Sequence, residues 1–140
     1  MLRTYLEDAA AARQLRTKVV EHHAGAAELA AARVVALPVK PNSYSGATTV
    51  LLQAMALAKP VVVSRTDAIA TGYGLEDRTN CRLVGPGDPD AFEQALLDTL
   101  ADPGTLGAHA RQTVEVGFSW EHYTSALWKI LSSAWEPEPS

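Results

Sequence analysis

The chain has 140 residues, of which 47% are hydrophobic and 20% charged, so it can bury a core and is expected to be globular. A net charge of −4 and twelve scattered Lys and Arg residues exclude a basic face for nucleic acid, which needs clustered cations. A single cysteine excludes an internal disulfide. No apolar run is long enough for a signal peptide or a membrane span. We therefore expect a soluble cytoplasmic protein, with peripheral contact at the inner face of the cell membrane left open.

The first part of the chain alternates between helical and strand patterns. Residues 2–16 are alanine-rich with an apolar face and predict a helix. β-Branched residues over 17–22 predict a short strand, and residues 26–32 suit one or two helical turns. The apolar run 33–37, which Pro38 ends, predicts a strand buried on both faces of a parallel sheet.

The middle of the chain continues the alternation. A polar loop over 39–46 leads into a predicted helix over 48–57. A second buried strand is predicted over 60–64, a single helical turn over 66–71, and a further short strand over 81–84.

The last part is helical. Asp88 followed by proline is typical of a helix start, and Ser119 can cap another helix. Helices are predicted over 89–100, 105–116 and 120–134. Residues 136–140 are expected to be a disordered tail.

Strands that alternate with helices predict an α/β fold: a Rossmann-like, doubly wound parallel sheet with helices on both faces and further helices at the carboxyl end. About four strands can be counted, whereas a complete doubly wound domain has five or six. We therefore expect residues 1–135 to form a single domain that lacks the first strands of its sheet.

The segment before the helix over 48–57 has the composition of a phosphate-binding turn. Ligands of open α/β sheets bind at the carboxyl ends of strands, and the first amides of a helix suit an anion. Gly46 lets the backbone approach closely, while Ser45, Thr48 and Thr49 carry hydroxyl donors. Gln53 shares a helix face with Thr49 and could hold a ribose hydroxyl. A plain turn with a helix cap is the alternative at this point.

Four stretches add a second kind of argument, because their order matches that of a known family. Residues 45–63 are similar to a motif of Glu-Gly, a short loop, Leu-Glu-Ala-Met-Ala, a small residue and Lys-Pro-Val-Val. Residues 80–88 are similar to Asn-Gly-x-Leu-Val-x-Pro-Gly-Asp, and residues 118–120 to a Phe-Ser-Trp that opens the last helix. Residues 27–38 match the preceding Glu-Leu turn and strand. Together they resemble the donor domain of GT-B glycosyltransferases of the glycogen-synthase-like, group 1 (family 4) type, over about 19–131.

The resemblance implies an enzyme that moves a sugar from a nucleoside-diphosphate sugar to an acceptor hydroxyl, usually with retention, with this chain as the donor-binding half. Fixed amides and a helix dipole would stabilise the departing diphosphate without a protein nucleophile. The resemblance also implies no metal or other cofactor, since this fold class generally works without one, and no catalytic side chain is assigned. The implied contacts are Gly46, Ala47, Thr48 and Thr49 to the diphosphate, Gln53 to the ribose and Ser45 to the sugar.

The sequence departs from the family at two positions. The family commonly has glutamates where this chain has Ser45 and Gln53, and Gln53 can donate and accept hydrogen bonds but carries no charge. The family's acceptor-binding domain and basic diphosphate ligands have no match here, so a missing domain or a partner subunit is expected. The alternative is an inactive glycosyltransferase-like module that binds nucleotides or partners. A flavodoxin-like regulator would need an acidic cluster after its first strand, and none is found.

The other notable residues have plainer interpretations. The histidines and the cysteine do not have the spacing of metal ligands; these are the pair His22-His23 and the single residues Cys81, His109 and His122. Residues 72–74 are expected to form a turn, with donor contact as the alternative. Packing is predicted for the aromatic residues Trp120, Tyr123, Trp128 and Trp135. In intact relatives the last helix crosses to the other domain, so without that domain its apolar face would be exposed and drive association.

Overall fold

A computed structural model describes residues 18, 20, 25–41 and 46–134. The chain divides into two compact units, residues 1–31 and 32–140. In the first unit, helix α2 (Gly25–Ala31) has no buried residue, and its Glu28 forms an ion pair with Lys18. The helix predicted over 2–16 and the tail lie outside the described residues. So does the strand predicted over 17–22, apart from Lys18 and Val20, neither of which lies in a strand.

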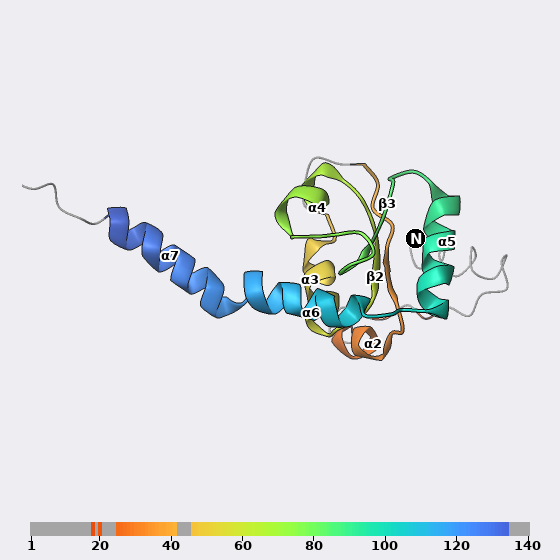
Figure 1. Cartoon of the computed structure of the whole chain (residues 1–140), viewed down its shortest axis with the longest axis horizontal. Coiled ribbons are helices and arrows are strands. Elements are labelled where there is room, and N and C mark those ends of the chain that lie inside the picture. The colour runs from red at the N-terminus through yellow and green to blue at the C-terminus, as the bar shows by residue number, and fades with distance from the viewer. Residues whose placement is uncertain (1–17, 19, 21–24, 42–45, 135–140) are drawn as a thin grey trace, which may run out of the picture. The chain divides into compact units, whose positions relative to one another are not determined.

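The second unit contains a parallel sheet, which Figure 1 shows between helices. Its strands are β1 (Val35–Leu37), β2 (Val61–Ser64) and β3 (Arg82–Val84), hydrogen-bonded in the order β1-β2-β3. The described residues thus hold three strands rather than the predicted four, and the difference is the strand expected over 17–22. The α/β, Rossmann-like class is confirmed.

Five helices follow the strands in the second unit's described residues. They are α3 (Thr48–Ala56), α4 (Asp67–Gly72), α5 (Pro89–Ala101), α6 (Leu106–Gly117) and α7 (Trp120–Ala134). Their starts follow the predicted chemistry. The Asp88 carboxylate accepts a hydrogen bond from the amide of Ala91 at 2.9 Å, and the Ser119 hydroxyl accepts one from that of His122 at 3.1 Å.

Helices cover both faces of β2. All four β2 residues are buried, and neighbouring residues of a strand point to opposite faces. Val62 packs with Val84 and with Ala95 of α5, so α5 covers one face. Val61 and Val63 point to the other face, where α3 contacts β2 through a helix side that buries Leu51, Ala54 and Met55. Figure 1 shows α3 and α5 on opposite sides of the strands.

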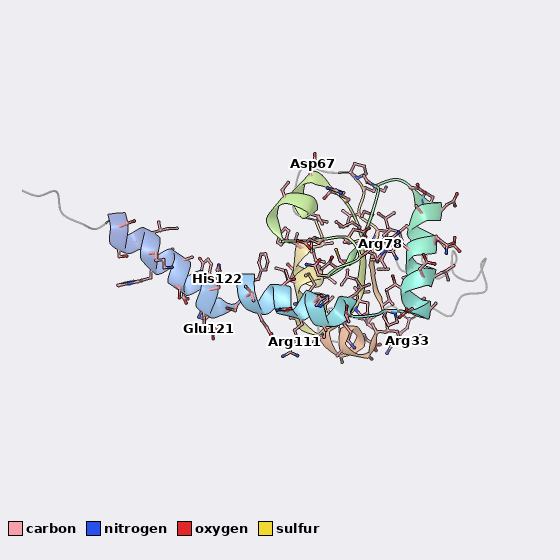
Figure 2. The ribbon with its side chains drawn as sticks, viewed as in Figure 1. Arg33, Asp67, Arg78, Arg111, Glu121 and His122 are labelled. Carbon is pink, nitrogen blue, oxygen red and sulfur yellow. The ribbon has the colours of Figure 1, made fainter. Side chains whose placement is uncertain are left out.

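Strand β1 corrects one detail of the sequence prediction. A strand over 33–37 buried on both faces was expected, but β1 begins at Val35, and Ala36 is exposed. Arg33 instead donates a hydrogen bond to the carbonyl of Leu100 at 3.0 Å, near the carboxyl end of α5 (Figure 2). Within the described sheet β1 is an edge strand, which leaves its side chains less covered than those of β2.

Helices α3 and α6 make the closest helix contact of the second unit. The residue Ala58, just after α3, has a left-handed φ of 55°. Its carbonyl faces Gly107 of α6, where an added Cβ would lie 2.1 Å from the Ala58 oxygen. Glycine is therefore required at this position because the backbone of one helix end passes directly over it.

The aromatic residues of α7 are exposed. No residue of α7 is buried, and Trp120, Tyr123 and Trp128 are 74%, 57% and 71% exposed. The rings of Trp120 and Tyr123 contact each other with centroids 5.6 Å apart, but none of the three residues is buried in a core, as packing would require. Trp135 lies outside the described residues.

Candidate functional site

The N-cap residue of α3 is an alanine. Ala47 has a left-handed φ of 64°, and among the described residues no side-chain hydrogen bond from the N-cap is found. The first backbone bond of α3 runs from the amide of Leu51 to the carbonyl of Ala47 at 2.9 Å. An alanine offers no acceptor to the helix amides that precede this bond, and those amides carry the positive end of the helix dipole. Such a helix end suits an anion.

The residues predicted at this site lie on the accessible side of α3. Gly46, Ala47 and Thr48 are half-buried, whereas Thr49 and Gln53 are exposed. Thr49 and Gln53 stand one turn apart on the side of the helix away from its buried residues. The structure thus brings five of the six residues together along one helix end, and Ser45 lies outside the described residues.

A hollow of about 290 Å³ opens at the carboxyl edge of the sheet. It is lined by the last residue of β2, by four residues after β1 and by residues after β3, namely Ser64, then Pro38, Val39, Lys40 and Pro41, then Gly85, Gly87, Asp88, Pro89 and Phe92. The start of α3 is not in this lining. Four of the lining residues, 38–41, belong to the segment between β1 and α3, and the same segment leads to the start of α3.

Ser64 joins two of the loops at this edge, and the sequence analysis did not single it out. Its hydroxyl accepts a hydrogen bond from the amide of Val39 at 3.1 Å, and the residue is only 4% exposed. A polar residue at the end of an otherwise apolar strand is the signal that could have identified it, because a buried hydroxyl needs a partner.

The residues before β3 are held by Asn80, which is 4% exposed. Its side-chain amide donates to the carbonyl of Gly74 at 2.8 Å and to the hydroxyl of Thr113 at 2.9 Å. Its side-chain carbonyl accepts from the amide of Glu76 at 2.9 Å. Of the turn predicted over 72–74, Gly72 instead ends α4 and Tyr73 is its C-cap, and the backbone turns at Gly74 with a φ of 59°. Asn80 therefore fixes this turn to α6.

Cys81 is fully buried, as predicted. The pKa of its thiol is raised from 9.0 to about 12, mainly by burial and also by the nearby Asp77 carboxylate, while the hydrogen bond to the Glu76 carbonyl lowers it. A thiol with so high a pKa is a poor nucleophile at neutral pH. Cys81 is a core residue rather than a reactive group.

The described residues contain neither a metal-binding cluster nor a helix that could span a membrane. Among residues 18, 20, 25–41 and 46–134, no three His, Cys, Asp or Glu side chains gather closely enough to hold a metal ion. The ring of His109 contacts the hydroxyl of Thr105 and the carbonyl of Thr79. In the same part of the chain no helix is both long and apolar enough to cross a membrane.

The comparisons with known proteins agree with the motifs and the fold. Residues 3–102 match a family model described as glycosyl transferases group 1. The chain belongs to this family. It is 34% identical over 112 residues to the MMP alpha-(1->4)-mannosyltransferase of Mycolicibacterium hassiacum. Its fold is similar to that of a sucrose-phosphate synthase from Thermosynechococcus elongatus, with a TM-score of 0.72 and 26% sequence identity.

The similarity covers only part of each relative. The mannosyltransferase alignment includes 78% of this chain and 26% of the relative, and the sucrose-phosphate synthase alignment includes 94% of this chain and 35% of that structure. The chain therefore spans about a quarter to a third of the length of these two relatives.

Proposed function

We propose that this chain supplies the donor-binding surface of a group 1 glycosyl transferase, which transfers a sugar from a nucleoside-diphosphate sugar to an acceptor hydroxyl. The observation that carries the proposal is the start of α3, which follows a strand of a parallel sheet and has an alanine, without a side-chain acceptor, at its N-cap. A diphosphate there would accept hydrogen bonds from the backbone amides of Gly46, Ala47, Thr48 and Thr49. The charge that develops on the leaving diphosphate would be stabilised by amides that are already oriented.

The remaining contacts follow from the direction of α3. Gln53 stands one turn along the exposed side, so a ribose attached to the diphosphate would extend along the helix towards its amide. Ser45, directly before Gly46, would contact the sugar or its phosphate. The base and the acceptor would be held by parts of the protein that do not belong to these residues, namely an acceptor domain or a partner subunit.

This role needs no metal or other cofactor, because amides and a helix dipole supply the positive potential. A second function is favoured by the residues at positions 45 and 53. Ser45 and Gln53 are neutral where the family commonly has glutamates, so a module that binds nucleotides without transferring sugar is the alternative. Assays for hydrolysis and transfer of sugar nucleotides distinguish the two functions.

Calorimetric titration of the 140-residue chain with UDP, GDP and ADP tests the proposal. We expect at least one to bind, with a 1:1 stoichiometry. The deciding comparison is Ala47→Asp against Ala47→Asn. Both side chains have similar size and tolerate a left-handed φ, but only aspartate places a negative charge beside the diphosphate.

We expect Ala47→Asp to weaken binding by about tenfold or more, since repulsion between close like charges reaches about 1 kcal/mol or more for each pair. Ala47→Asn, which can cap the same amides but adds no charge, should bind at least about tenfold more tightly than Ala47→Asp. No binding of any of the three nucleotides, or equal affinity in the two variants, would contradict a diphosphate site at the start of α3.

A further inference from the structure

The bond between Ser64 and Val39 changes how the sheet ends. Strand β1 pairs with β2 in register, Val35 with Val61 through Leu37 with Val63, and the amide of Val35 donates to the carbonyl of Pro60 at 2.9 Å. In a parallel ladder the donors recur at every second residue. If this pattern continued beyond β1, the amide of Val39 would donate to the backbone carbonyl of Ser64.

The Val39 amide donates to the side-chain hydroxyl of Ser64 instead, at 3.1 Å. Ser64 lies two residues after Val62, so its side chain points to the face of the sheet that α5 covers. The chain that follows β1 is therefore displaced out of the ladder towards that face. The hollow that Pro38, Val39 and Ser64 line opens at this divergence.

A short connection joins Val39 to α3, and α3 covers the face of the sheet opposite to α5. Only seven positions separate Val39 from Gly46, and Pro38 and Pro41 restrict the backbone at its start. The direction in which the chain leaves β1 therefore limits how Gly46 and Ala47 can be placed.

We propose that Ser64 is a positioning residue for the donor site: its hydroxyl holds Val39, seven positions before Gly46, and so limits where the first amides of α3 lie relative to the diphosphate. This role rests on the proposed function. It assigns no contact between Ser64 and the substrate. The hydroxyl acts through the Val39 amide, and the burial of Ser64 keeps water from competing for that hydrogen bond.

The test compares Ser64→Ala and Ser64→Thr with the wild-type chain. The probe is whichever of UDP, GDP and ADP binds the wild type most tightly, and hydrogen exchange reports on the Val39 amide. Thr99→Val is the matched control, because Thr99 is 1% exposed and its hydroxyl donates within α5 to the carbonyl of Ala95 at 2.7 Å. Val39→Pro removes the same donor while leaving Ser64 in place.

For Ser64→Ala we expect a Kd about three- to tenfold higher, the value of one lost net hydrogen bond, and exchange of the Val39 amide about tenfold faster or more. Ser64→Thr should restore both quantities to within about twofold. Val39→Pro should weaken binding as Ser64→Ala does, which keeps a binding test available if the alanine variant does not fold. Thr99→Val should lower stability and leave the Kd unchanged.

An unchanged Kd in Ser64→Ala or Val39→Pro, unchanged exchange of Val39, or an equal loss of affinity in Thr99→Val would overturn this role alone. Absence of nucleotide binding by the wild type would overturn the proposed function together with it. The two failures are therefore distinguishable in one set of titrations.

Discussion

Replacing Gly107 by alanine tests the packing that fixes α3 in place. An ideal Cβ at this position would lie 2.1 Å from the carbonyl oxygen of Ala58 and 2.9 Å from its carbon. Both atoms belong to the backbone, so no side chain can rotate away. A carbon and an oxygen approach to roughly 3.3 Å at closest without strain, and the two helices must therefore separate by about 1 Å.

The magnitude follows from two opposing effects. Overpacking of a close interface costs about 1–3 kcal/mol or more, and Gly107 lies beside the buried residues Leu106 and Ala110, whose contacts would open as well. Alanine in place of a helical glycine gains about 0.5–1 kcal/mol. We expect a net loss of about 2–3 kcal/mol in the free energy of unfolding, and a Tm lower by about 5–15 °C.

Urea unfolding followed by circular dichroism measures this loss. Gly117→Ala is the matched control, since it lies in the same helix with no heavy atom within 4 Å of its added Cβ. The control should be as stable as the wild type or slightly more stable. If Gly107→Ala stayed within about 0.5 kcal/mol of the wild type, the close approach of α6 to Ala58 would be refuted.

Four further changes have expected outcomes. Asn80→Ala should lower the free energy of unfolding by about 2–3 kcal/mol in urea titrations, because it removes three part-buried hydrogen bonds of a buried side chain. Ala58→Gly should raise that free energy by about 0.5–1 kcal/mol, because glycine adopts a φ of 55° without strain. The pKa of the Cys81 thiol is raised from 9.0 to about 12, so its contribution to stability is complete below pH 9 and is lost as the pH rises towards 12. In urea titrations between pH 9 and 10.5, the free energy of unfolding should therefore fall more steeply for the wild type than for Cys81→Ala. Gln53→Glu should tighten nucleotide binding by about threefold in calorimetry, because a carboxylate forms stronger bonds to ribose hydroxyls.

Local chemistry made much of the fold predictable. The helix that starts at Pro89 was identified from Asp88 and the proline after it, and the cap bond of 2.9 Å confirms the reason. The run over 61–63 predicted a strand buried on both faces, and all three valines are fully buried. These patterns succeed because caps and apolar runs depend on neighbours within a few positions.

Features that depend on distant parts of the chain could not be predicted from local patterns. Strand β1 begins at Val35, two residues later than predicted. The side chain of Arg33 bonds instead to a carbonyl at the end of α5, 67 positions later. The need for glycine at position 107 comes from Ala58, in a different helix connection. The exposure of Trp120 depends on which surfaces are present to cover α7, and an amphipathic sequence alone does not specify its partner.

At the candidate site, the motif located the start of the helix but did not predict the conformation of its N-cap residue. The sequence identified hydroxyls at Thr48 and Thr49 and a glycine at position 46, whereas the structure adds an N-cap alanine at a left-handed φ, which leaves the capping position without a side-chain acceptor. A capping serine or aspartate at position 47 would satisfy helix amides internally and compete with an anion for them. An alanine at the N-cap, which has no side-chain acceptor of its own, is therefore the feature that the structure adds in favour of a bound diphosphate.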